Sequence, residues 1–238
     1  MATVSLKVLS GGAVQRGLES AANIFEKDTG HKIDIMFATA PAIRRKMESE
    51  ESSPDVVLAP VPAIDELTKS GHVSAGSSAM IGCVKAGVVV RQGVPEPDIS
   101  SSQSFKQEIL DSHSLVYNEG SSGIFVEKLL EQLGVAEQAK AKTIRYPDAE
   151  GVMKHLAAGR TSKEIGFGQI TAILLHAGRG LKLVGPLPRE IENITTYAAG
   201  VSTRAQAPEV AQQFVRFLVK PPAREAFKAG GVDEPARR

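Results

Sequence analysis

The chain has 238 residues, a formal net charge of +1, one cysteine and 42% hydrophobic residues. This length and composition exclude a disordered chain and fit one large domain or two small ones. The near-neutral charge gives no basis for nucleic-acid binding, and Cys83 alone excludes an internal disulfide or a thiolate metal cluster. No stretch has the roughly 18 consecutive apolar residues of a membrane helix, so no membrane insertion is expected.

Strands and helices are predicted to alternate from the start of the chain. Runs of apolar residues predict three strands, at 4–9, 33–37 and 55–59. Apolar residues at helical spacing follow each strand, and a glycine or a proline marks an end of each helix. Three consecutive strand–helix pairs predict a mainly parallel sheet covered by helices on both faces.

The alternation continues to the C-terminus, with two unusually long strand-like runs. Strands are predicted at 83–90, 114–117, 143–146, 165–168, 181–184 and 195–201, with helices between them and two more at the end. No Gly/Ser-rich linker separates two domains, so the runs at 83–90 and 195–201 are candidates for strands that cross between them. We expect an α/β fold of two lobes, with residues 1–82 plus 196–238 in lobe one and 83–195 in lobe two.

Four loops of small residues lie between a strand and the helix that follows it. A helix N-terminus has unpaired N–H groups and the positive end of the helix dipole, and small side chains let an anion approach them. In parallel sheets such loops lie at the carboxyl ends of the strands, where ligands bind. The loops therefore predict an anion held in a cleft between the lobes, and the alternative is ordinary turns and helix caps. They are Ser10-Gly11-Gly12-Ala13, Thr39-Ala40-Pro41, Gly120-Ser121-Ser122-Gly123 and Asp148-Ala149-Glu150-Gly151.

Two further polar residues lie close to these loops in the sequence. Arg44 follows the second loop by one turn and is either a clamp for a carboxylate or a surface residue. Gln169 follows the strand at 165–168, where its amide either contacts a ligand or caps the next helix. No phosphate loop or nucleophile elbow occurs, so neither a cofactor nor a metal is expected. The histidines lack metal-ligand spacing and are expected on the surface: His31, His72, His113, His155 and His176.

The chain resembles the molybdate-binding branch of the type 2 periplasmic binding proteins over nearly its whole length. The resemblance implies two α/β lobes, each a mainly parallel sheet flanked by helices, joined by two crossing strands with the ligand between them. The segments that carry it are Leu6-Lys7-Val8-Leu9-Ser10-Gly11-Gly12-Ala13, Phe25-Glu26-Lys27-Asp28-Thr29-Gly30, Phe37-Ala38-Thr39-Ala40, Pro54-Asp55-Val56-Val57, Ser122-Gly123-Ile124-Phe125 and Glu164-Ile165-Gly166-Phe167-Gly168.

The resemblance also implies which residues contact the ligand. Carried over by position, the contacts are Ala13, Ala40, Ser122 and Gly151, with Gln169 as the fifth. The molybdate binders have serines where this chain has its two alanines and a tyrosine where it has the glutamine. Losing these hydroxyl donors weakens the case for a tetrahedral oxyanion, although Ser10 and Thr39 lie next to the alanines. A carboxylate ligand is compatible with Arg44, the Gln169 amide and backbone N–H groups.

These features predict a monomeric solute-binding protein that captures a small anion, an oxyanion such as molybdate or a carboxylate, with no catalytic residue. Met1 to Leu9 lacks the pattern of a signal peptide. We expect a periplasmic protein that delivers its ligand to an ABC permease if an export signal has been removed, and a cytoplasmic protein otherwise. A ligand sensor that acts through a partner is a further possibility.

The alternative is an enzyme. Aconitate isomerase is similar to the same molybdate-binding family, and the resemblance implies a proton shift on a small polycarboxylate. Such a reaction needs a base and carboxylate clamps. The candidate bases beside the predicted loops are Glu119, Tyr146, Asp148 and Glu150, each of which is otherwise a turn residue or a helix-terminal acid.

Overall fold

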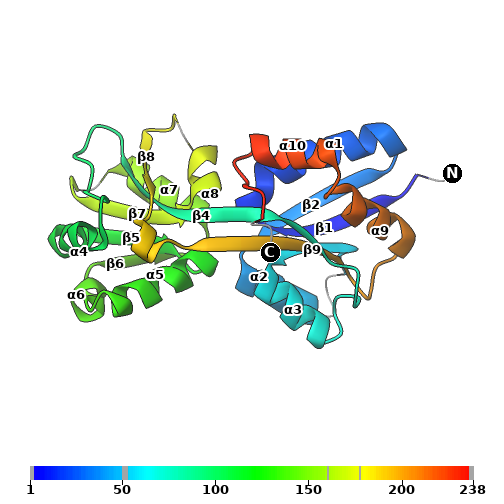
Figure 1. Cartoon of the computed structure of the whole chain (residues 1–238), viewed down its shortest axis with the longest axis horizontal. Helices are drawn as coiled ribbons and strands as arrows, with labels where there is room; N and C mark the ends of the chain where they lie inside the picture. The colour runs from blue at the N-terminus through cyan, green and yellow to red at the C-terminus, as the bar shows by residue number, and fades with distance from the viewer. Residues whose placement is uncertain (1–2, 50–52, 160, 177, 236–238) are drawn as a thin grey trace. The chain divides into compact units, whose positions relative to one another are not determined.

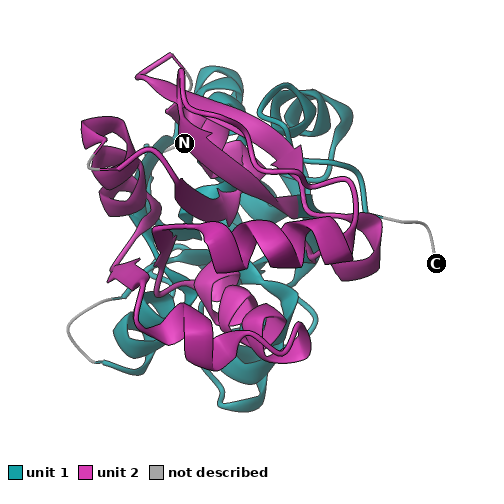
Figure 2. Cartoon of the chain, turned by 90° about the vertical axis from the view of Figure 1, so that its left-hand side faces the viewer, with its two compact units in different colours: residues 1–84, 195–238 teal, residues 85–194 magenta. Residues whose placement is uncertain are grey.

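The computed structural model describes residues 3–49, 53–159, 161–176 and 178–235. The chain forms two compact units (Figure 2). Unit 1 comprises residues 1–84 and 195–238, and unit 2 comprises residues 85–194. The chain passes from one unit to the other within strand β4 (Ala79–Arg91) and at the start of strand β9 (Ile194–Val201).

Unit 1 contains a sheet in the order β2-β1-β3-β9. The predicted strands at its start are confirmed as β1 (Ser5–Gly11), β2 (Lys32–Ala38) and β3 (Val56–Pro60), which run parallel. β9 pairs with β3 in the antiparallel direction. The helices of this unit are α1 (Gln15–Thr29), α2 (Ala40–Glu48), α3 (Val61–Lys69), α9 (Pro208–Phe217) and α10 (Pro221–Ala229), and a short 3-10 turn, Gly12–Val14, precedes α1.

The strands of unit 1 bury side chains on both faces of the sheet. On one face Leu6 and Val8 pack with Phe25 and Phe214 from α1 and α9. On the other face Leu9 and Val57 pack with residues of α2 and α3. Figure 1 shows α1 and α10 on one side of β1 and β2, and α2 and α3 on the other. The predicted sheet with helices on both faces is confirmed for this unit.

Unit 2 repeats this plan with a different chain order. Its sheet has the order β4-β7-β5-β6, with β8 (Leu181–Pro186) paired to β4. The parallel strands are β5 (Ser114–Asn118), β6 (Thr143–Tyr146) and β7 (Glu164–Gln169), and β4 is antiparallel to β7. The helices are α4 (Ser102–Asp111), α5 (Ser121–Gln132), α6 (Ala136–Lys140), α7 (Ala149–Ala158) and α8 (Ile170–Leu175), with a 3-10 turn at Arg189–Ile191.

Two buried clusters lie on opposite faces of this second sheet. Phe105, Val126 and Phe167 belong to the cluster beneath α4 and α5. Val116, Val152 and related residues form the cluster beneath α7 and α8. The helices of the two faces can be followed in Figure 1. Each unit therefore presents the carboxyl ends of its parallel strands along one edge of its sheet, and this edge positions the predicted loops.

Candidate functional site

Two of the predicted loops lie side by side in unit 1. β1 and β2 are parallel neighbours, and their last residues, Gly11 and Ala38, are register partners. The 3-10 turn that leads into α1 therefore begins beside the first turn of α2. Neither turn has a side-chain cap within the described residues. Two adjacent helix starts whose N-cap residues form no side-chain cap make this edge the most suitable place for an anion in unit 1.

The residues of these two loops differ in how open they are. Ser10 is buried, and its hydroxyl donates to the carbonyl oxygen of Gly11 at 3.1 Å. Ala13 is buried as well, whereas Thr39 and Ala40 are half-buried. A β-carbon at Gly12 would meet no non-neighbouring heavy atom of the described residues within 4 Å. The backbone at Gly12 is thus open to close approach.

The loop between β5 and α5 is more tightly built. Asn118 ends β5, and its side-chain oxygen accepts from the N–H of Gly120 at 2.8 Å and from the hydroxyl of Ser122 at 3.4 Å. Ser122 is buried, and Ser121 is half-buried at the first position of α5. A β-carbon at Gly123 would lie 1.6 Å from the carbonyl oxygen of Asn118, so glycine alone lets α5 begin this close to the strand. As a donor to a ligand, the Ser122 hydroxyl would have to turn away from Asn118.

The loop between β6 and α7 lies next to that one. Asn118 and Tyr146 are register partners at the ends of β5 and β6, and Glu119 donates its N–H to the Tyr146 carbonyl oxygen at 2.9 Å. Asp148 caps α7 by accepting from the N–H of Gly151 at 2.9 Å. Glu150 is exposed and pairs with Lys154 at 2.7 Å, and this hydrogen bond and charge lower the pKa of the Glu150 carboxyl. This helix start already carries a carboxylate, in contrast to those of unit 1.

The remaining predicted contacts have different surroundings. Gln169 is buried at the end of β7, which is parallel to β5 and ends at the same edge. Arg44 donates to Glu48 at 2.9 Å and to Glu66 at 3.1 Å, and its side chain is 59% exposed. Glu48 raises the pKa of the guanidinium through a hydrogen bond. Of the two interpretations of Arg44, these contacts favour the surface residue, because a clamp would have to leave both carboxylates.

The structure also shows which contacts the candidate bases of the enzymatic alternative make. Asp148 is committed to its cap and Glu150 to Lys154, while the Tyr146 hydroxyl bonds with Nδ1 of His155 at 2.9 Å. Glu119 is exposed at the start of its loop. Among the four candidates, Glu119 is the one whose side chain forms no hydrogen bond or ion pair with another described residue.

Two histidine predictions were wrong. His31 is buried in the turn after α1, where its Nδ1 accepts from the N–H of Val4 at 3.3 Å. His155 is buried on α7, and its Nε2 lies 3.0 Å from the carboxylate of Glu164. A signal for His155 existed in the sequence, since it lies three residues after Val152 on the apolar face of α7. His176, by contrast, is half-buried, and burial, with a smaller contribution from Arg179, lowers its pKa.

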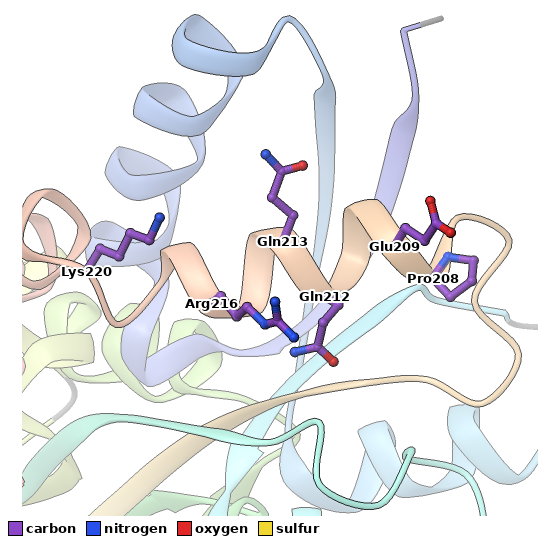
Figure 3. Close-up of a pocket in the computed structure, with 6 residues that line it drawn as sticks. All are labelled: Pro208, Glu209, Gln212, Gln213, Arg216 and Lys220. Carbon is purple, nitrogen blue, oxygen red and sulfur yellow. The ribbon is translucent and has the colours of Figure 1, made fainter. Parts of the chain in front are cut away.

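A pocket of about 580 Å³ lies elsewhere on unit 1, along α9 (Figure 3). It is lined by Pro208, Glu209, Gln212, Gln213, Arg216 and Lys220. None of these residues belongs to a predicted loop. Within the described parts of the chain, no helix is long and apolar enough to span a membrane, and no group of three potential metal ligands occurs.

The sheets, their order and the loops at the strand ends define a type 2 periplasmic binding protein. A family of bacterial extracellular solute-binding proteins matches residues 6–233, and the chain belongs to this family. The periplasmic molybdate-binding protein of Azotobacter vinelandii has the same fold, with a TM-score of 0.76 and 20% identity over 97% of this chain and 99% of that one.

Two relatives refine the comparison. The chain is 33% identical over 236 residues to an aconitate isomerase from Pseudomonas sp, which covers 96% of this chain and 87% of the relative. It is 25% identical over 227 residues to the molybdate-binding protein ModA of Azotobacter vinelandii, covering 90% of this chain and 84% of the relative. The expected resemblance is confirmed in both of its branches.

Proposed function

We propose that the chain captures a small anion reversibly, with contacts from its strand-end loops. The observation that carries this proposal is the pair of adjacent helix starts in unit 1, at Gly12 and Ala40, that lack side-chain caps within the described residues. Backbone N–H groups at such positions stabilise negative charge without a basic side chain. We further propose that an exported form of the protein delivers this anion to an ABC permease, in keeping with its family.

The ligand class follows from the side chains at the loops. Ala13 and Ala40 add methyl groups where hydroxyl donors would serve a tetrahedral oxyanion. A carboxylate is planar and has two oxygen atoms, so it needs fewer hydrogen-bond donors than a tetrahedral oxyanion. Backbone N–H groups and the Gln169 amide are enough to bind it. We therefore favour a di- or tricarboxylate over molybdate, although the family relationship to molybdate binders keeps the oxyanion as the competing ligand.

The experiment is a thermal-shift screen of the purified chain. It compares molybdate, tungstate, sulfate and phosphate with a panel of di- and tricarboxylates that includes cis-aconitate. A ligand at one hundred times its dissociation constant stabilises the folded state by about 2.7 kcal/mol, a readily measured shift. Stabilisation by carboxylates alone supports the favoured ligand, stabilisation by molybdate or tungstate alone replaces it with an oxyanion, and no shift with any anion contradicts the proposal.

The loop assignment has its own test in Ser122→Asp, which places a negative charge in the proposed anion site. We expect calorimetry to show no binding of the anion that stabilises the unchanged chain. Ser101→Asp is the matched control, because it adds the same charge at the N-cap of α4, where aspartate is a good cap. Since Ser122 is buried, the half-buried Ser121→Asp repeats the test should the first variant not fold. Unchanged affinity in a folded variant would remove this loop from the site.

A second candidate function is isomerisation of a small polycarboxylate. The observation in its favour is the 33% identity to aconitate isomerase over 96% of the chain. Conversion of cis- to trans-aconitate by the purified chain, followed by chromatography, tests it directly. Catalysis that Glu119→Gln abolishes would make Glu119 the base, and binding of cis-aconitate without conversion would leave the binding function alone.

A further inference from the structure

A chain of hydrogen-bonded side chains lies inside unit 2, beneath α7. The Tyr146 hydroxyl lies 2.9 Å from Nδ1 of His155, and Nε2 of His155 lies 3.0 Å from Oε1 of Glu164. Ser114 donates its hydroxyl to the same oxygen at 3.0 Å. The side chains of His155 and Glu164 are 3% and 5% exposed, so two ionisable groups are withdrawn from water. The surrounding cluster is otherwise aliphatic and includes Val116, Val152 and Leu156.

This arrangement is a poor device for stability alone. The second carboxylate oxygen of Glu164 is buried and has no hydrogen-bond partner among the described residues. A buried oxygen without a partner opposes folding, and burying two ionisable groups together is often no more stabilising than burying apolar residues of the same volume. The chain of hydrogen bonds therefore points to a role beyond holding the core together.

Tyr146, at one end of this series of hydrogen bonds, supports one of the predicted ligand loops. A β-carbon at Gly151 would lie 2.8 Å from Cδ1 of Tyr146 and 3.0 Å from its Cβ and Cγ. The tyrosine ring thus fills the space of the missing side chain at 151 and sets how closely the first turn of α7 approaches β6. Gly151 is a predicted ligand contact, so the ring position determines where the N–H groups of this turn lie.

The same contact recurs at two other predicted loops. A β-carbon at Gly11 would lie 3.0 Å from Cε1 of Tyr197, and one at Gly123 would lie 3.2 Å from Cδ2 of Tyr117. The sequence contains three tyrosines, and each of them lies against the glycine of a different predicted loop. Tyr146 differs from the other two tyrosines because its hydroxyl is hydrogen-bonded to the buried imidazole of His155, which is in turn bonded to the carboxylate of Glu164.

The hydrogen bonds specify the orientation of the Tyr146 ring. Nε2 of His155 faces the carboxylate of Glu164 and carries the proton in that bond. In the neutral imidazole, Nδ1 is then the acceptor of the Tyr146 O–H. Glu164 fixes the imidazole, and the imidazole fixes the hydroxyl. We propose that Tyr146 is a positioning residue for the ligand loop at 148–151, held in place by His155 and Glu164; this inference rests on the anion-binding function proposed above.

Two substitutions at position 155 separate the two bonds of the imidazole. The amide of His155→Asn reaches the place of Nδ1 and keeps a partner for Tyr146, whereas the amide of His155→Gln reaches the place of Nε2 and keeps a partner for Glu164. Tyr146→Phe retains the ring and removes the hydroxyl. Ser112→Ala is the matched control, because it removes a buried hydroxyl before the start of β5, away from the predicted loops, where Ser112 donates to the carbonyl oxygen of Ile109.

The affinity of each variant is measured by calorimetry with cis-aconitate and with molybdate. We expect Tyr146→Phe and His155→Gln to weaken binding about tenfold, and His155→Asn and Ser112→Ala to stay within threefold of the unchanged chain. Hydrogen exchange of the Gly151 and Val152 amides supplies a readout that needs no ligand. We expect faster exchange in the two weakened variants, with an unchanged thermal midpoint of unfolding.

The outcomes distinguish this inference from the function on which it rests. If the unchanged chain binds neither anion, the proposed function fails for these ligands, and unaltered exchange in Tyr146→Phe would overturn the positioning role as well. If the unchanged chain binds but Tyr146→Phe binds equally well, the positioning role alone is overturned. If His155→Asn and His155→Gln lose affinity equally and both have a lowered thermal midpoint, then Tyr146, His155 and Glu164 serve stability. This outcome would also overturn the positioning role.

Discussion

The two units use the same plan of strand, small-residue loop and helix, yet they build the loop differently. In unit 1 the backbone at Gly12 is open, because a β-carbon there would meet no non-neighbouring heavy atom of the described chain within 4 Å. In unit 2 a β-carbon at Gly123 would overlap the carbonyl oxygen of Asn118 at 1.6 Å. The glycine of a predicted ligand loop therefore leaves the backbone accessible in unit 1, at Gly12, and allows close packing of helix on strand in unit 2, at Gly123.

The units also differ in how they join distant segments of the chain. In unit 1 the carboxylate of Asp55, which is 3% exposed, accepts from the N–H groups of Lys7, Gln206 and Ala207 at 2.8, 2.7 and 3.5 Å. In unit 2 the ammonium of Lys142 donates to the carbonyl oxygens of Ile109, Leu110 and Ser112 at 2.7, 2.7 and 3.0 Å. We call the Asp55 carboxylate the anchor of unit 1 and the Lys142 ammonium the anchor of unit 2. Unit 1 is discontinuous in sequence, so its anchor joins segments about 150 residues apart, whereas that of unit 2 joins segments about 30 residues apart.

The largest effect is expected from alanine at the two glycines. Neither Gly12 nor Gly123 has a positive φ, so the two positions differ in space and not in backbone strain. Gly123→Ala should lower the free energy of unfolding by at least about 3 kcal/mol, because the methyl group meets backbone that cannot move aside. Gly12→Ala should change it by less than about 0.5 kcal/mol. Urea unfolding followed by circular dichroism measures the free energy of unfolding of both variants. Equal losses would contradict the proposed difference between an open loop at Gly12 and a closely packed loop at Gly123.

A smaller effect is expected at the anchor of unit 1. Asp55→Ala leaves the N–H groups of Lys7 and Gln206 without their acceptor and should lower the free energy of unfolding by about 2–3 kcal/mol. Asp65→Ala, at an exposed position of α3, is the matched control and should stay within about 0.5 kcal/mol. Urea titration provides the measurement. A loss no greater than that of the control would mean that the C-terminal segment is held by apolar packing alone.

The anchor of unit 2 should contribute least. Lys142→Met removes three donated hydrogen bonds but keeps the aliphatic stem. Because the lost hydration of the half-buried ammonium offsets part of these bonds, we expect a loss of about 1–2 kcal/mol. Lys140→Met, at the exposed end of α6, should have no measurable effect. Thermal unfolding by calorimetry can rank this variant against Asp55→Ala. A larger loss for Lys142→Met would reverse the expected order of the two anchors.

Much of the fold was predictable because the signals are local. The alternation of strands and helices and the short loops at the strand ends follow from apolar spacing and from glycine and proline positions. Helix α6 (Ala136–Lys140) was not predicted, since five residues carry too little periodicity to distinguish a helix from a turn. The burial of His31 and His155 was not predictable from residue type, because histidine occurs both inside proteins and on their surfaces.

Side-chain contacts between segments distant in the sequence could not be predicted. Arg44 pairs with Glu66, 22 residues away, and Tyr197 lies against Gly11 although 186 positions separate them. Such pairs depend on which strands become neighbours, which apolar spacing along one segment does not specify.

The sequence by itself determined the family, through its resemblance to known members. It also determined the alternation of strands and helices, because burial periodicity and helix-start chemistry act over a few residues. Only the tertiary structure decided that Gly12 is open and Gly123 closed, that Arg44 lies in surface ion pairs, and that Tyr146 is linked through His155 to Glu164. Those outcomes depend on distances between atoms from separate segments. Such distances exist only once the chain has packed.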